Sequence, residues 1–163
     1  MFLKNESKII SLDLDGYQLT YFLKYLDNIK QCLHEINKRY EIENVKVYES
    51  KKGLNIVLTT KLNIDVTQQL YYRLIMFDDL FRLRADIFKL YKKQDHRINR
   101  IWINKDWKDK KEIIDMTFSS YEKISFLNII DLIVRLGYFG NKKLYALNKE
   151  KEKKELRKCK KKF

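Results

Sequence analysis

Alternating apolar and polar residues from Val45 to Thr60 predict a β-hairpin, VKVYESKKGLNIVLTT. Apolar residues recur at every second position in both arms, and Lys51-Lys52-Gly53 supplies the turn. Successive side chains of a strand point to opposite faces of a sheet, so one face of the hairpin is apolar and suited to a core. The other face carries polar and aromatic groups suited to a ligand: Lys46, Tyr48, Ser50 and Asn55.

A first strand and a first helix precede the hairpin. Residues Ile9 to Asp15 alternate as IISLDLD, with Asp13 and Asp15 on the polar side. Gly16 then permits a turn, and apolar residues from Leu19 to Tyr40 keep helical spacing over six turns. The order to this point is β-α-β-β.

A second helical pattern covers Val66 to Lys93. Asp65 with Gln68 resembles a capping box at its start, and two competing apolar stripes predict a break near Asp78-Asp79, with Asp79 capping the second piece. Residues Ile101 to Asn104 predict a short strand with Trp102 on its polar side. The resulting order, β-α-β-β-α-β, is that of an α+β ferredoxin-like or RRM-like sandwich over residues 1–107.

The remaining chain predicts a helical extension and a basic tail. Residues 108–148 begin with the charged loop Lys108 to Lys111, and Ser119 with Glu122 forms a second capping-box pattern before a helix that should stop at Gly137. Residues 149–163 are predicted to leave the helix as a solvated tail.

Charge favours a polyanionic partner. The chain of 163 residues has a net charge of +13, and residues 149–162 hold nine Lys/Arg against three Glu. The other residues keep 26 basic against 19 acidic side chains, so the tail alone does not explain the basicity. Nucleic acid is the first expectation and an anionic membrane surface the second. No apolar stretch reaches the roughly 20 residues of a bilayer span, and two cysteines predict no disulfide framework, so a cytoplasmic location is expected.

The polar face of the predicted sheet admits two chemistries. Tyr48 and Trp102 can stack on unpaired bases while Lys46, Lys51 and Lys52 meet phosphates. The alternative is that both rings pack under the C-terminal helices.

The two acids of the first strand admit a metal. Asp13 and Asp15 at i and i+2 share a face about 7 Å apart, a separation that suits Mg²⁺ and phosphoryl transfer. The alternative is a strand end that runs into solvent, because D-x-D is common.

Charged residues of the second helix also have two interpretations. Asp78, Arg82 and Asp86 stand four residues apart, which favours a self-satisfied ladder of ion pairs. In the functional interpretation, Arg73 and Arg82 bind a phosphate of a nucleic acid.

The strand IISLDLD, the helix after it and the hairpin segment YESKKGLNIVL resemble the catalytic module of archaeo-eukaryotic primase-polymerases. In that family a hydrophobic strand ends in D-x-D and a later hairpin strand carries a serine and a histidine. The resemblance implies metal binding by Asp13 and Asp15 and a motif role for Ser50. Asn55 stands where the family has its nucleotide-contacting histidine, and an amide carries no charge to a triphosphate.

A closer resemblance covers Ile9 to Lys105 and is to small uncharacterised proteins of archaeal viruses and plasmids. It rests on the pattern R-x4-D-D-x-x-R-x3-D followed by a short apolar strand and lysine. The residues of the pattern are Arg73, Asp78, Asp79, Arg82 and Asp86. The resemblance implies a mobile-element origin, with the host cytoplasm as the location.

Three hypotheses follow. The first is a nucleic-acid-binding protein of a virus or plasmid, acting in replication or genome handling, with degenerate primase-like features. The second is an active Mg²⁺-dependent nucleotidyltransferase or nuclease that uses Asp13 and Asp15. The third is a protein-interaction module, such as a homodimeric regulator of a host protein, that uses the sheet face as its interface.

Overall fold

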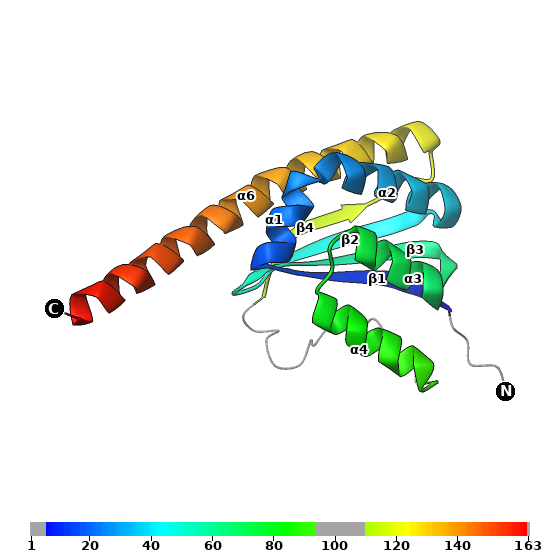
Figure 1. The fold of residues 1–163 in the computed structure, drawn as a ribbon. Coiled ribbons are helices and arrows are strands. Elements are labelled where there is room, and N and C mark those ends of the chain that lie inside the picture. The colour runs from blue at the N-terminus through cyan, green and yellow to red at the C-terminus, as the bar shows by residue number, and fades with distance from the viewer. Residues whose placement is uncertain (1–5, 94–109, 163) are drawn as a thin grey trace.

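A computed structural model describes residues 6–93 and 110–162 as one antiparallel sheet with helices on it (Figure 1). The predicted hairpin and first strand are present with the expected turn. The elements in chain order are β1 (Glu6–Asp15), α1 (Gly16–Lys24), α2 (Leu26–Tyr40), β2 (Ile42–Glu49), β3 (Gly53–Asp65), α3 (Val66–Ile75), α4 (Leu80–Tyr91), β4 (Lys111–Thr117) and α6 (Glu122–Lys161).

The sheet order is β1-β3-β2-β4. The α+β class is therefore confirmed, but the ferredoxin-like order is not, because β4 pairs with β2 at the edge opposite β1. The strand predicted at 101–104 lies outside the described residues. The strand β4 was missed, since its Lys111 was assigned to a charged loop, and only Ile114 and Met116 mark its buried side.

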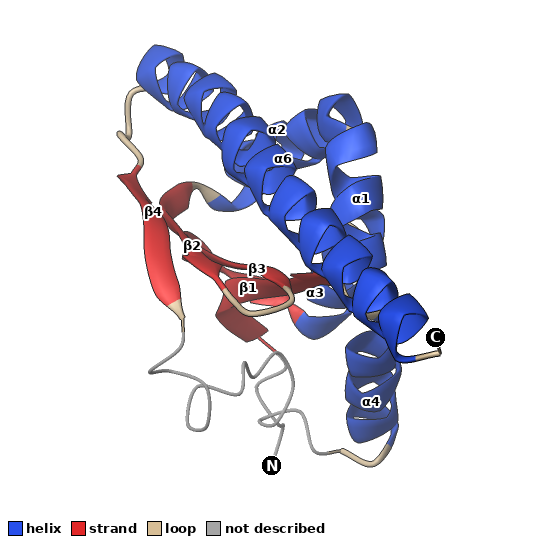
Figure 2. Cartoon of the chain, turned by 90° about the vertical axis from the view of Figure 1, so that its left-hand side faces the viewer, coloured by secondary structure: helices blue, strands red, loops and turns tan. Residues whose placement is uncertain are grey.

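Helices α1, α2 and α6 cover one face of the sheet (Figure 2). The predicted helix from Leu19 to Tyr40 is two helices that meet at Tyr25, whose φ of −112° and ψ of 35° depart from helical geometry. Both pieces bury apolar side chains against the sheet, as Phe22 and Ile29 do.

The helix α6 is 40 residues long and corrects two predictions. It does not stop at Gly137, and residues 149–161 remain helical. The missing side chain of Gly140 allows close packing, because a Cβ there would lie 2.6 Å from Leu23 of α1. The helix begins after Tyr121, so Ser119 is not its N-cap residue, although the Ser119 hydroxyl accepts a hydrogen bond from the Tyr121 N–H.

The chain breaks between α3 and α4 where the sequence predicted. Asp79 is the N-cap residue of α4, and its Oδ1 accepts a hydrogen bond of 2.9 Å from the Phe81 N–H. Asp65 occupies the N-cap position of α3, but its side chain makes no capping bond. Helix α4 lies on the side of the sheet away from α2 and α6 (Figure 1).

The α3–α4 junction pairs with strand β1. The Asp13 N–H donates to Asp78 Oδ1 over 2.7 Å, and the Asp79 N–H donates to the Asp13 carbonyl over 3.2 Å. The junction therefore fixes Asp79 beside the carboxyl end of β1. Among the described helices, none has the length and apolar character needed to cross a bilayer.

Candidate metal and nucleic-acid site

The strand register places three predicted site residues in one row across the sheet. Asp13 of β1 lies opposite Asn55 of β3, and Asn55 lies opposite Tyr48 of β2. Directly opposed residues share a face, and the buried Leu12, Leu14, Leu54 and Ile56 occupy the other one. The predicted gathering of acid, amide and ring on a single face is confirmed.

This face lies opposite the one that α6 covers. Leu132 and Leu136 of α6 belong to the core formed with the apolar sides of β1 and β3. The alternative in which Tyr48 packs under the C-terminal helix is therefore wrong. Asn55 is only 3% exposed, however, so the row is not fully open to a ligand.

Three carboxylates meet at the end of β1. One oxygen each from Asp13, Asp15 and Asp79 lies within 4.8 Å of the other two, and all three side chains are partly buried. Asp13 and Asp15 come from alternate positions of one strand, and Asp79 comes from the N-cap of α4. The alternative of a strand end that runs into solvent is correct only in part, because Asp15 occupies the N-cap position of α1 without a side-chain capping bond, whereas Asp13 and Asp15 are both partly buried. We call Asp13, Asp15 and Asp79 the carboxylate triad.

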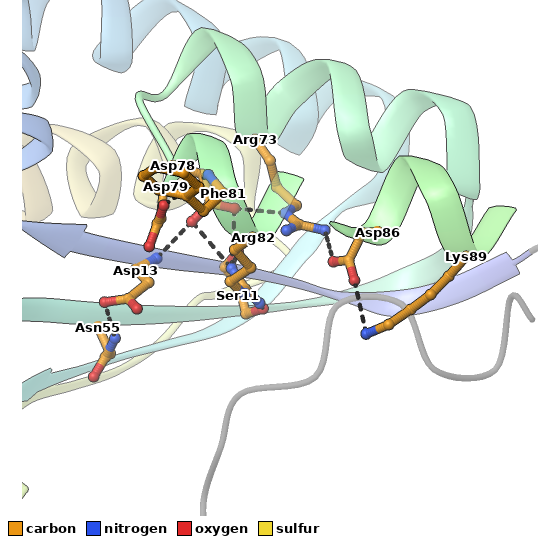
Figure 3. A network of polar contacts seen from close by, with 10 residues as sticks. All are labelled: Ser11, Asp13, Asn55, Arg73, Asp78, Asp79, Phe81, Arg82, Asp86 and Lys89. Atoms are coloured by element: carbon orange, nitrogen blue, oxygen red, sulfur yellow. Dashed lines mark hydrogen bonds and ion pairs between the residues drawn. The ribbon is translucent and has the colours of Figure 1, made fainter. Parts of the chain in front are cut away.

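Hydrogen bonds orient two members of the triad (Figure 3). Asn55 Nδ2 donates to Asp13 Oδ1 over 2.8 Å, and the Phe81 N–H donates to Asp79 Oδ1. In each case a bond to one carboxylate oxygen leaves the second for another partner. This arrangement limits rotation of the carboxylates and sets their direction.

The carboxylates raise one another's proton affinity. Partial burial, and then the neighbouring Asp15, raise the pKa of Asp13 from 3.8 to about 6. Burial and the charge of Asp79 raise the pKa of Asp15, while Lys52 opposes the increase. A divalent cation would remove this mutual repulsion, because its charge stabilises the ionised form of every carboxylate beside it.

The donor set fits Mg²⁺ or Mn²⁺. Both ions prefer hard oxygen ligands, and Mg²⁺ is commonly bound by one or two carboxylates with waters and phosphate completing the shell. The described residues contribute no sulfur or imidazole to the triad. Asp13, Asp15 and Asp79 would hold the ion, and Lys52 of the hairpin turn would meet a phosphate on it.

Arg73 is not available to a nucleic acid. Its side chain is 0% exposed, and it bridges two buried acids, with Nε 2.8 Å from Asp78 Oδ2 and Nη1 2.7 Å from Asp86 Oδ2. Asp86 also pairs with Lys89 at 3.3 Å (Figure 3). The prediction that Arg73 binds a phosphate is wrong, because burial and two partners occupy it.

Arg82 is also occupied by the protein. Its Nη1 lies 3.0 Å from both oxygens of Asp78 and donates to the Ser11 carbonyl over 2.8 Å, and its Nη2 contacts the Ser11 hydroxyl. The ladder interpretation is correct for the Arg82–Asp78 pair. Asp86 pairs across to α3 instead, so the network fastens α4 to β1 and α3.

The remaining predicted residues lie around the hairpin turn. Ser50 closes the turn, since its hydroxyl accepts from the Gly53 N–H over 3.2 Å. Lys51 and Lys52 are exposed at the tip, and Lys46 lies 3.8 Å from Glu112 of β4. Trp102 lies outside the described residues.

Sequence reasoning missed Asp79 as the third acid. Its carboxylate was assigned to capping, a role that it does perform. The adjacent acids of the R-x4-D-D pattern were the available signal, but only the fold brings them to β1. Asp78 turns inward to the arginines while Asp79 turns to the triad.

A second basic feature is the C-terminal third of α6, defined here as residues 149–161. It continues past the sheet and the other helices (Figure 1), and every side chain in it is exposed. The lysines therefore face solvent around the helix. We call this segment the basic arm.

No protein-family model, curated protein or solved structure matches the chain.

Proposed function

We propose that this protein binds nucleic acid through its basic arm. The observation that carries the proposal is the full exposure of a helical segment that concentrates five of the thirteen net positive charges. Thirteen helical residues extend over about 20 Å, so a phosphate backbone can run along several lysines at once. The strand-helix-hairpin unit with D-x-D, which resembles primase-polymerases, supports a role in replication or genome handling of a virus or plasmid.

Salt dependence tests this proposal. Binding driven by counterion release weakens linearly in log K against log salt, by about 0.7 per neutralised phosphate on a single strand. Replacing four arm lysines by glutamine should lower the slope by about 3. The test residues are Lys151, Lys153, Lys154 and Lys158.

The matched control removes the same charge from exposed lysines of the body. Its residues are Lys24, Lys38, Lys61 and Lys123. Fluorescence anisotropy with labelled single-stranded and duplex oligonucleotides measures both variants. Equal losses in the two variants, or no binding by the wild type at about 50 mM salt, would remove the proposal.

A second candidate function is metal-dependent phosphoryl transfer at the carboxylate triad. The observation that favours it is the approach of three carboxylates beside Lys52, on the face that also carries Asn55 and Tyr48. A bound divalent ion would polarise a phosphoryl oxygen and stabilise the charge that develops during transfer. The triad would hold the ion, Asn55 would orient Asp13, and Lys52 would attract the phosphate.

Mn²⁺ binding and activity test the second candidate separately. Asp79→Asn should weaken Mn²⁺ binding measured by electron paramagnetic resonance, whereas Asp65→Asn, at the exposed N-cap of α3, should not. Extension and cleavage of a labelled oligonucleotide with Mg²⁺ or Mn²⁺ and nucleotides provide the activity assay. A wild type that is inert and binds no Mn²⁺ would end this candidate and leave the basic arm as the function.

A further inference from the structure

Helix α6 has two apolar stripes on opposite sides. The side toward the sheet buries Ser125, Ile129, Leu132, Leu136 and Gly140. A second stripe at intervals of three and four residues is exposed. At about 3.6 residues per turn, it lies across the helix from the buried set. Its members are Leu127 at 60%, Ile130 at 36%, Val134 at 65% and Tyr138 at 64% exposed.

This outer stripe is electrically balanced in a strongly basic protein. Residues 122–140 contain two acids and two bases, Glu122, Asp131, Lys123 and Arg135, for a net charge of zero. A polyanion has no electrostatic reason to bind there. A second copy of a +13 chain, by contrast, can approach this segment without meeting an excess of like charge.

The charges beside the stripe are complementary to those of a second copy only when the two helices run antiparallel. Asp131 and Arg135 form an i,i+4 pair at 3.1 Å on one flank of the stripe. When two identical helices pack antiparallel about a two-fold axis, the same flank of each meets the other. Asp131 of one copy then faces Arg135 of the second, and the pair becomes a group of four alternating charges.

A parallel arrangement is disfavoured by the basic arms. It would align two arms of net +5 along their whole length. The antiparallel arrangement sends the two arms to opposite ends and separates them by the length of the paired segments. Repulsion between like charges therefore selects the antiparallel direction.

We propose that the outer stripe of α6 binds the same stripe of a second copy, antiparallel, with the two-fold axis at Val134. Val134 packs on Val134 of the second copy, and Ile130 packs on its Tyr138. The apolar contacts bury the exposed stripe, which is the main driving force for such pairs. This interface is separate from the basic arm and the triad, and its test requires neither nucleic acid nor metal.

Sedimentation velocity over a concentration series up to about 0.1 mM measures the association of the full chain. The wild type should form dimers, and Val134→Glu should be monomeric because it sets two carboxylates against each other at the axis. Leu156→Glu makes the same charge change at a residue that is also exposed, 61%, but lies in the basic arm. It should leave the dimer intact.

Cysteine cross-linking tests the direction. In a Cys159→Ser background, with Cys32 buried, an antiparallel pair brings residue 127 of one copy near residue 141 of the other. Leu127→Cys mixed with Asn141→Cys should give disulfide heterodimers, and Leu127→Cys alone should not cross-link. Cross-linking of Leu127→Cys with itself would overturn the antiparallel direction.

A wild type that stays monomeric, or a dimer unchanged by Val134→Glu, overturns the proposal. Flotation with anionic vesicles separates one further outcome. A monomer that floats with vesicles and loses flotation in Val134→Glu would assign the outer stripe to a membrane surface, and the dimer would be refuted.

Discussion

Replacing Asp13 by asparagine should stabilise the protein at neutral pH. The folded environment raises the pKa of Asp13 from 3.8 to about 6, so the folded chain holds this proton more tightly than the unfolded chain does. The stabilising contribution of Asp13 is complete below about pH 4 and is lost as the pH rises through about 6. Asparagine stays neutral throughout, and its Oδ1 can still accept the hydrogen bond from Asn55.

The size of the effect follows from the shift. Two pKa units correspond to about 3 kcal/mol at 1.36 kcal/mol per unit. The Asp13 side chain is partly exposed, and solvent screening reduces this value to about 1 to 2 kcal/mol. The stability gain of Asp13→Asn should therefore be about 1 to 2 kcal/mol near pH 7.5 and close to zero near pH 4.

Urea denaturation at both pH values measures the difference. Asp115→Asn is the matched control, because Asp115 is an exposed strand residue whose carboxylate accepts an asparagine amide at 2.8 Å, as Asp13 does. It should change stability by less than about 0.5 kcal/mol. Destabilisation by Asp13→Asn near pH 7.5 would refute the reasoning, since it would mean that the site favours the ionised carboxylate.

Metal extends the same experiment. A ligand that binds only the folded state stabilises it by about 2.7 kcal/mol at one hundred times its dissociation constant. If the triad holds Mg²⁺ or Mn²⁺, the wild type should gain stability on metal addition and Asp13→Asn should gain less. Equal gains would place the bound metal elsewhere.

Two further changes test the supports of the site. Arg73→Ala should cost about 3 kcal/mol by denaturation, because it removes the buried cation that bridges Asp78 and Asp86 and leaves only Arg82 and Lys89 beside them. The exposed Arg84→Ala should cost less than about 0.5 kcal/mol. Gly53→Ala should cost about 3 kcal/mol or more and weaken Mn²⁺ binding, because its Cβ would lie 1.8 Å from the Leu14 carbonyl oxygen. Gly16→Ala is the control and should be tolerated, because no atom lies within 4 Å of a Cβ at that position. Similar stabilities for the two glycine variants would contradict the strand packing.

Local patterns were sufficient for the hairpin and for the shared face. Period-two alternation depends only on neighbouring residues, so Asp13, Asn55 and Tyr48 could be assigned to one face before their partners were known. The break before Asp79 was likewise visible in the competing stripes and the capping residue.

The burial of Arg73, the length of α6 and the sheet order depend on long-range packing, which local sequence patterns do not contain. Arg73 carries the same charge as any surface arginine, and only the meeting of α3, α4 and β1 buries it. Gly137 is a common helix terminator, but in α6 it is followed by Gly140, whose small size permits contact with α1. The short strand β4 was obscured by its charged start, and its pairing with β2 set the sheet order.

The α3–α4 junction also has a consequence for the outer border of the sheet. At Asp13 both main-chain groups of β1 are taken by Asp78 and Asp79, and nearby Arg82 holds the Ser11 carbonyl. At these positions an extended segment from another molecule cannot add to β1 by strand pairing, which protects against aggregation. Displacement of α4 would expose this border and separate Asp79 from Asp13 and Asp15. The same movement would therefore leave an unpaired strand edge and disperse the three carboxylates proposed to bind a metal ion.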